Sequence, residues 1–516
     1  MKSLKATQSR TEGGTGARMA FLMGIDLGTS SVKVLIQDEA GKTQHVRSRS
    51  YPIDVPCEGC AEQSPVGWWE ATSAAISEAI RTSGVPAAAI KCVGLSGQMH
   101  GTVLINKQHQ AIGPAIIHCD QRSGAQVNRV YQTVGRDAFH AVTRNPLFPG
   151  FQLATLRWLL ENEPERYHKA ALVLSPKDYV RLQMTGEAAT EYSDASATLA
   201  FDMNDHRWAD EIITSMGLKM SKFPPIYRSL AIAGEMTAMA AAKTGLARGT
   251  PVILGGADQP MQALGNGAVL PGVMTSTIGT GGQIFTPIRT CRFDESYRTL
   301  TFHNLEPQTY YALGAILNAG LCLKWLNEKV LHYPDFNSLS AAAEAVPPSS
   351  LGLLFLPYLT GERVPFAARP MTGSFIGLTL QHDGAAMARA VMEGVVFALR
   401  ERVDAIGSAE TIHRVIASGG GANSRLWLQL QADIYNREIF RSNMTEQACT
   451  GAAMAAGTAI GIYKDLAEAC RRVVKLNPEP VTPKPENVKR YDAQYARYLE
   501  LARQYANDET TEETSK

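Results

Sequence analysis

The sequence lacks both a net charge and any long hydrophobic run. Its 50 lysines and arginines balance its 49 aspartates and glutamates, so the formal net charge is +1. A dedicated nucleic-acid-binding protein carries a strong excess of positive charge, and this class is therefore excluded. No run of about 18 consecutive apolar residues occurs, so we expect no membrane-spanning helix and no membrane partner.

Residues 1–20 lack the apolar core of a secretory signal peptide, and we expect them to form a disordered leader. The eight cysteines are too scattered to indicate a disulfide framework, which favours a cytoplasmic location. Only Cys57 and Cys60 form a C-x-x-C pattern. A zinc site would need a second pair of ligands, which the sequence does not supply. We interpret this pattern as a loop coincidence rather than a redox or zinc centre.

The phosphate-binding pattern G-x-x-x-x-G-K-[ST] is missing, which excludes a P-loop enzyme. Instead, three glycine-rich turns at residues 28–30, 279–282 and 419–421 each follow an apolar strand. The first two turns resemble each other, since Leu27-Gly28-Thr29-Ser30 is echoed by Ile278-Gly279-Thr280-Gly281 about half a chain later. This echo predicts duplicated domains that face each other across a cleft.

Strand and helix signals alternate along the chain, which indicates an α/β fold. Ser64-Pro65 predicts a helix start, with Ser64 as the cap and with Trp69 and Ile76 on the apolar face. The other expected elements are strands at 90–95, 251–254 and 415–417, and helices at 387–406, 451–457 and 486–505.

The first glycine turn carries groups that suit an anion. Backbone N–H groups of the turn and the hydroxyls of Thr29 and Ser30 can surround phosphate oxygens. Asp26 precedes the turn within an apolar strand. It either binds Mg²⁺, which proteins usually hold with one or two carboxylates plus phosphates, or caps the turn.

The later turns offer comparable sites. Gly279, Thr280 and Gly281 predict a second phosphate cradle, and the glycines at 419–421 leave a helix N-terminus open to a nucleotide. Asp258 follows two glycines at a strand end. It is suited to take the proton of an acceptor hydroxyl, although an aspartate there also serves as a helix cap.

Two further groups of polar residues are candidates for binding a polyol. Gln98, Met99 and His100 follow a buried strand and combine hydrogen-bonding groups with an apolar surface; packing is the alternative role. Asp120 and Arg122 either bind hydroxyl groups or pair with each other.

These segments together resemble the FGGY carbohydrate kinases, and xylulokinase-like members in particular. The matching segments keep the family's order between residues of about 22 and 460, and they are 23–34, 96–101, 174–179, 255–258, 358–363 and 419–424. The resemblance implies two ribonuclease-H-like domains that flank a deep cleft, as in the superfamily of sugar kinases, actin and heat-shock ATPases. We expect a leader at 1–20, a sugar-binding domain at 21–265, a nucleotide-binding domain at 266–470 and a helical tail at 471–516.

The resemblance also implies the activity: ATP-dependent phosphorylation of D-xylulose to D-xylulose 5-phosphate, with ATP and Mg²⁺ as cofactors. The alternatives are another ketose, a polyol or a sugar acid as substrate, or a non-catalytic binding protein on the same fold. Family habit adds an expected homodimer. The implied roles of the two carboxylates are catalytic base for Asp258 and metal ligand for Asp26. The residues expected to bind the sugar are Gln98, Met99, His100 and Asp258. Those expected to bind the nucleotide are Thr29, Ser30, Lys33, Gly279, Thr280, Gly281, Gly420, Gly421 and Asn423.

The sequence departs from the family pattern near the expected sugar site. His118 and Cys119 stand where relatives commonly have Trp and Asn, and Cys60 stands where the family tends to have Trp. Sites that hydrogen-bond substrate hydroxyls discriminate strongly between substrates. These departures therefore leave the identity of the sugar open.

Overall fold

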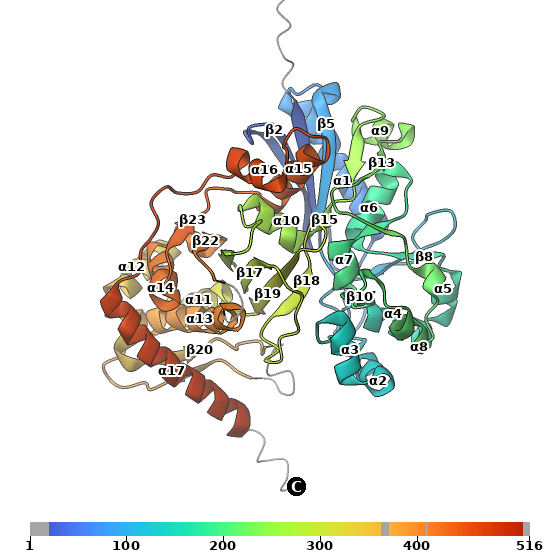
Figure 1. Ribbon diagram of the computed structural model, residues 1–516. Helices are drawn as coiled ribbons and strands as arrows, with labels where there is room; N and C mark the ends of the chain where they lie inside the picture. The colour runs from blue at the N-terminus through green and yellow to red at the C-terminus, as the bar shows by residue number, and fades with distance from the viewer. Residues whose placement is uncertain (1–19, 363–370, 408–410, 509–516) are drawn as a thin grey trace, which may run out of the picture.

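The computed structural model describes residues 20–362, 371–407 and 411–508, and shows two α/β halves side by side (Figure 1). Of the expected leader, only Ala20 belongs to the described residues. Arg363, the last residue of the 358–363 segment, also lies outside them. None of the described helices is long and apolar enough to cross a membrane.

The N-terminal half is built on a mixed sheet with the strand order β13-β14-β5-β1-β2-β3, in which β15 also pairs with β5. The strand β1 is antiparallel to β2 and parallel to β5. The strands are β1 (Phe21–Leu27), β2 (Ser31–Asp38), β3 (Thr43–Ser50), β5 (Ile90–Gly97), β13 (Ile232–Glu235), β14 (Pro251–Ile253) and β15 (Gly256–Ala257).

The C-terminal half repeats this arrangement in the order β18-β19-β17-β16-β22-β23. Here β16 is antiparallel to β17 and parallel to β22, so β16 takes the place of β1. The two similar glycine turns join β1 to β2 and β16 to β17, which confirms the predicted duplication. The strands are β16 (Val273–Ile278), β17 (Gly282–Ile288), β18 (Leu300–His303), β19 (Tyr310–Ile316), β22 (Arg414–Ser418) and β23 (Ile439–Arg441).

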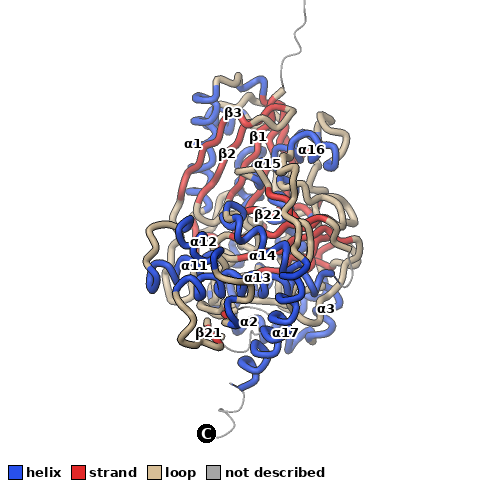
Figure 2. The backbone as a smooth tube through the Cα atoms, turned by 90° about the vertical axis from the view of Figure 1, so that its left-hand side faces the viewer, coloured by secondary structure: helices blue, strands red, loops and turns tan. Residues whose placement is uncertain are grey.

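Helices cover both faces of the N-terminal sheet because side chains of a strand alternate between its faces. Met23 and Ile25 of β1 share a core with α1 (Pro65–Ser83), whereas Leu22 packs with α15 (Gln447–Ala459). Figure 2 shows α1 and α15 on opposite sides of these strands.

The helix α1 starts as predicted. The Ser64 hydroxyl accepts a hydrogen bond from Gly67 N at 3.1 Å, which confirms Ser64 as the cap. Trp68 rather than Trp69 is the fully buried tryptophan of the helix, whereas Trp69 lies at the edge of the core with Lys243 over its ring.

Three elements of the C-terminal half enclose its core: α13 (Gly384–Gly407), α14 (Arg425–Tyr435) and α17 (Pro485–Asp508). The predicted tail helix is α17. Its Tyr491 hydroxyl donates to Glu393 Oε1 at 2.7 Å, and Tyr498 lies 3.1 Å from the Tyr358 hydroxyl. The tail is therefore packed into this half.

The remaining elements are shorter or lie at the periphery. The helices are α2 (Gly124–Val134), α3 (Arg136–Thr143), α4 (Gln152–Asn162), α5 (Pro164–Lys169), α6 (Pro176–Thr185), α7 (Tyr192–Ala197), α8 (Asp210–Ser215), α9 (Ala238–Thr244), α10 (Asp258–Gly265), α11 (Gly320–Leu326), α12 (Phe336–Ala345) and α16 (Leu466–Val473). Short strand pairs are β4 (Glu62–Gln63) with β7 (Ala115–Ile116), β6 (Val103–Ile105) with β8 (Leu172–Leu174), β9 (Thr190–Glu191) with β12 (Ile226–Tyr227), β10 (Phe201–Asp202) with β11 (Arg207–Trp208), and β20 (Leu354–Leu356) with β21 (Ser374–Ile376).

Candidate active site

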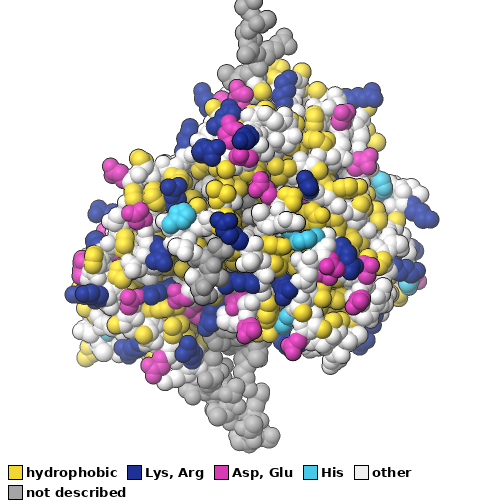
Figure 3. All heavy atoms as spheres, in the orientation of Figure 1, with side chains coloured by type: hydrophobic (Ala, Val, Ile, Leu, Met, Phe, Trp, Pro, Cys, Tyr) yellow, Lys and Arg dark blue, Asp and Glu magenta, His cyan; other side chains and the backbone are white. Residues whose placement is uncertain are grey.

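A cleft of about 530 Å³ is lined by residues of both halves. It brings together most of the residues predicted for the sugar and for the phosphates. These are Thr29, Gln98, Met99, His100 and Asp258 from the N-terminal half, and Gly279 and Gly281 from the C-terminal half. On the face shown in Figure 3, basic and acidic side chains are interspersed around the middle of the molecule.

Asp258 is the first residue of α10 and follows directly on β15, which pairs with the end of β5. The cap position of α10 belongs to Ala257, so Asp258 is not the helix cap. Its Oδ1 is buried and has no hydrogen-bond partner within the described chain. Burial, reinforced by the charge of Asp26, raises the pKa of Asp258 to about 7. A carboxylate with these properties is suited to general-base catalysis near neutral pH.

Asp26 lies near the end of β1, and its Oδ1 accepts a hydrogen bond from the Ser96 hydroxyl at 2.7 Å. Burial raises its pKa above the usual value. Lys33 faces Asp26 across the β1–β2 pair, and its ammonium lies 2.8 Å from Glu446 Oε2. Lys33, predicted to bind nucleotide, is thus held by Glu446 and does not line the cleft.

Each phosphate turn is closed by a backbone hydrogen bond from its first glycine, although the first turn is one residue longer than the second. Gly28 N donates to Ser31 O at 3.1 Å, and Gly279 N donates to Gly281 O at 2.9 Å. These amides are therefore already used within the turns. Thr29 lines the cleft and Ser30 is exposed. A β-carbon on Gly281 would lie 2.8 Å from Ile316 O, so the second turn requires glycine there.

The predicted sugar-binding residues form one wall of the cleft. Gln98 donates through Nε2 to Gln63 at 2.9 Å, whereas its buried Oε1 has no partner among the residues described and can accept from a hydroxyl. Met99 is buried, and the Tyr311 hydroxyl lies 3.8 Å from its sulfur. His100 contacts Ala197 O through Nδ1 at 2.7 Å.

Several cleft residues escaped the sequence analysis, and four of them have side chains suited to ligand contact. Phe148 and Phe151 add an apolar surface, and the His100 ring lies 4.1 Å from that of Phe151. Tyr297 and Arg298 enter from the C-terminal half. Aromatic residues in loops give no periodic signal, so only the folded chain identifies them.

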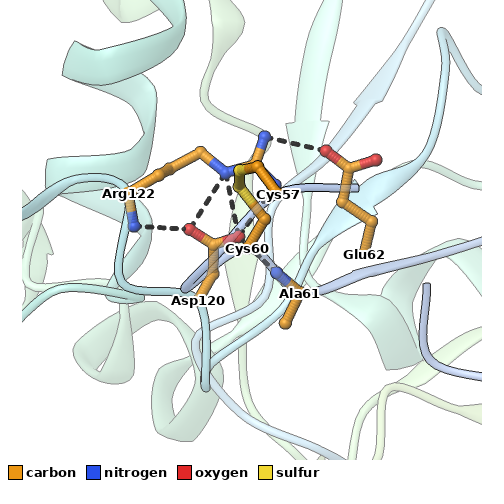
Figure 4. The surroundings of a disulfide bond; sticks show 6 residues. All are labelled: Cys57, Cys60, Ala61, Glu62, Asp120 and Arg122. Atoms are coloured by element: carbon orange, nitrogen blue, oxygen red, sulfur yellow. Dashed lines mark hydrogen bonds and ion pairs between the residues drawn. A yellow bond between two sulfur atoms is a disulfide. The ribbon is translucent and has the colours of Figure 1, made fainter. Parts of the chain in front are cut away.

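Asp120 and Arg122 pair with each other rather than line the cleft (Figure 4). Arg122 Nε lies 2.9 Å from Asp120 Oδ2, and Arg122 Nη1 lies 2.8 Å from Glu62 Oε1. Ala61 N donates to the same Asp120 oxygen at 2.7 Å. This buried pair thus fixes Ala61 and the start of β4 against the segment that contains His118, which does line the cleft.

Cys57 and Cys60 are joined by a disulfide beside this pair (Figure 4). The interpretation of the C-x-x-C pattern as a coincidence is therefore wrong. Gly59 has a φ of +72°, and Cys60 N donates to Cys57 O at 3.0 Å. This tight turn brings the two Cα atoms to 5.1 Å, a separation at which disulfides form.

A second cavity of about 480 Å³ shares Gly279 with the cleft. Its lining includes Thr280 and the third glycine-rich turn, with Gly420, Gly421 and Asn423. Asn423 Oδ1 also accepts from Arg441 at 2.9 Å. The structure therefore places the predicted adenosine-side residues next to the second phosphate turn.

Comparisons with known proteins agree with this geometry. The models for the N-terminal and C-terminal domains of the FGGY family of carbohydrate kinases match residues 21–265 and 274–460. Xylulose kinase of Bacillus subtilis is 35% identical in sequence to this chain, and the alignment covers 94% of this chain and 97% of that kinase. Gluconokinase of the same organism is 29% identical over 86% of this chain and 87% of its own.

Solved structures show the same fold. The xylulose kinase of Rhodospirillum rubrum matches with a TM-score of 0.87 and 29% identity over 94% of this chain and 99% of its own. The enzyme of Brucella ovis, also described as a xylulose kinase, matches with a TM-score of 0.86. Its sequence identity is 32%, and the match covers 93% of this chain and 98% of that enzyme's chain. Both family models together span most of the chain, and the chain therefore belongs to the FGGY family of carbohydrate kinases.

Proposed function

We propose that this kinase transfers the γ-phosphoryl group of ATP to the terminal hydroxyl of D-xylulose, giving D-xylulose 5-phosphate. The observation that carries the proposal is the position of Asp258, whose buried Oδ1 lies in a cleft shared by both halves. The relatives named xylulose kinase at 35% and 32% identity support this ketose as the substrate.

Asp258 acts as the general base in this proposal. Its Oδ1 accepts the proton of the sugar hydroxyl while that oxygen bonds to the γ-phosphorus and the bond to the β-phosphate oxygen breaks. Gln98 Oε1 accepts a hydrogen bond from another hydroxyl and orients the sugar. Met99 and Phe151 contact its carbon chain.

The nucleotide occupies the second cavity, with its phosphates directed to the shared turn at Gly279. Asp26 is the carboxylate that would hold Mg²⁺, which takes one or two protein carboxylates together with phosphates and water, and its charge reaches Asp258 of the cleft. No cluster of three or more potential metal ligands occurs in the described ranges. When bound, Mg²⁺ neutralises charge on the phosphates.

A sugar acid is the second candidate substrate, and one residue favours it. Arg298 lines the cleft, and its Nε lies 3.1 Å from Glu401 Oε2. A carboxylate substrate would compete with Glu401 for this guanidinium. The similarity to a gluconokinase also agrees with this alternative.

A substrate panel tests the proposal. ATP consumption is measured with D-xylulose, other pentuloses, hexuloses, polyols and gluconate at matched concentrations. We expect the highest kcat/KM for D-xylulose. Failure with D-xylulose together with turnover of gluconate would instead select the sugar acid, and Arg298→Gln should then raise the KM for gluconate.

We also propose a cytoplasmic location and assembly as a homodimer. A cytoplasmic location agrees with a nucleotide-dependent activity. Cyclic dimers are the commonest oligomers of globular enzymes. Sedimentation velocity of the purified chain tests the dimer.

A further inference from the structure

Five charged side chains form a fully buried cluster beneath the strand end that carries Asp258. They come from α6 and from the segment of β9 and α7, and they are Lys177, Asp178, Arg181, Glu191 and Asp194. Lys177 Nζ lies 2.9 Å from Asp178 Oδ1, 3.1 Å from Asp194 Oδ2 and 3.6 Å from Glu191 Oε1. Buried charges cost free energy even when they are paired, so stability alone is a weak reason for such a cluster.

Asp194 is the carboxylate of the cluster whose ionisation burial opposes most clearly. Two cations face three carboxylates, which leaves one negative charge in excess. Burial raises the pKa of Asp194 well above its usual value, and the charges of Asp178 and Glu191 raise it further. Burial lowers the pKa of Lys177, but the surrounding carboxylates outweigh this effect and keep it an ammonium.

The cluster holds both ends of the segment that precedes Asp258. Lys177 Nζ and Arg181 Nη1 donate to Leu254 O at 3.2 and 3.4 Å. At the other end, Ala257 N donates to the Ser193 hydroxyl oxygen at 2.9 Å. Ala257 is the residue before Asp258, so this bond fixes the Gly256–Ala257 peptide, one residue before the Cα atom that carries the carboxylate.

Glu191 determines the direction of the Ser193 hydroxyl. That hydroxyl donates its single proton to Glu191 Oε1 at 2.8 Å, and its lone pairs are then left to accept from Ala257 N. Glu191 is itself fixed, because Ser193 N donates to Oε2 at 2.8 Å and the Ser229 hydroxyl donates at 2.6 Å.

We propose that Ser193, oriented by Glu191, is a positioning residue for Asp258: it fixes the Ala257 peptide so that the carboxylate meets the acceptor hydroxyl. This inference rests on the proposed function of Asp258 as the base. It adds a chain of contacts from Lys177 through Glu191 and Ser193 to that base.

The variant Ser193→Ala removes the acceptor for Ala257 N and leaves the predicted sugar and nucleotide contacts in place. We expect kcat to fall about tenfold or more, since small misplacements of a reacting group reduce the rate strongly, whereas the KM for sugar and for ATP stays within about twofold. Ser193→Thr keeps the hydroxyl and should restore most of kcat.

Ser196→Ala is the matched control. Ser196 lies on the same short helix and is also buried. Its hydroxyl donates to Ser193 O at 3.0 Å and accepts from His303 N at 3.1 Å, and neither bond involves Ala257. We expect it to change the melting temperature but not kcat. Equal kcat values for wild type, Ser193→Ala and Ser196→Ala would overturn the inference.

If Ser193→Ala does not fold, Glu191→Gln provides the second test. It keeps an oxygen that can accept from Ser193 but removes the charge, and we expect a smaller loss of kcat at unchanged KM. An unchanged kcat overturns the inference here too.

Asp258→Asn separates the two proposals, because full activity of that variant rejects the proposed base whatever Ser193→Ala shows. The best substrate of the panel is used throughout.

Discussion

Gly24 of β1 faces the carbonyl oxygen of Cys449 in α15 so closely that a β-carbon on Gly24 would lie 1.8 Å from that oxygen. The contact joins backbone to backbone, so no side chain can move aside to relieve an added methyl group. Gly94 of β5 meets Ala452 O in the same way. The helix therefore lies directly on the sheet that carries Asp26.

We predict that Gly24→Ala lowers the free energy of unfolding by about 3 kcal/mol, because the helix must shift away from the sheet. Urea unfolding measures the change. Gly407→Ala is the control, since Gly407 ends α13 and a β-carbon there would meet no atom of the described residues within 4 Å. Equal stability of the two variants would contradict the prediction.

Asp258→Asn should reduce kcat by about 10³, because an amide cannot accept the proton of the sugar hydroxyl. Binding of the sugar should remain measurable by calorimetry, since the variant keeps the shape of the side chain. A residual rate within tenfold of wild type would exclude Asp258 as the base.

The activity should depend on pH through Asp258. Its pKa in the free protein is raised to about 7, so the carboxylate is protonated and inactive below this pH and becomes an effective base above it. We predict that kcat/KM for the sugar rises between about pH 6 and about pH 8 with the slope of a single ionisation. A flat profile over this range would argue against the assignment.

Reduction of the Cys57–Cys60 disulfide should cost at most about 2 kcal/mol, because the bond closes only a very short loop. The turn keeps its other contacts, since Gln121 N donates to Gly59 O at 2.7 Å. Thermal unfolding with and without a dithiol measures the effect. The double variant Cys57→Ser and Cys60→Ser should not respond to the dithiol, and a response would trace the change to another cysteine.

Local signals predicted the elements well. The turn at Gly28 and its echo at Gly279 identified the two equivalent hairpins, because a strand, a glycine turn and a second strand are encoded by neighbouring residues. The start of α1 followed from Ser64-Pro65 for the same reason. The predicted sugar residues Gln98 and His100 also line the cleft.

Contacts between distant segments could not be predicted in this way. Tyr297 and Arg298 reach the cleft only because the chain folds back between β17 and β18. Two partners of Lys177, Glu191 and Asp194, are separated from it in sequence, so its charge gave no sign of a buried cluster. The sequence predicted a helix at 451–457, within α15, but did not indicate against which strands it packs.

The packing of α15 has a consequence for the order of folding during synthesis. This helix covers one face of β1 and β5, yet its residues lie at 447–459, more than 300 positions after β5 in the sequence. The N-terminal half therefore leaves the ribosome with an apolar face uncovered, and it gains its native partner only when most of the chain has been translated. The two halves resemble separate domains in the order of their strands, but they complete their folding as one unit.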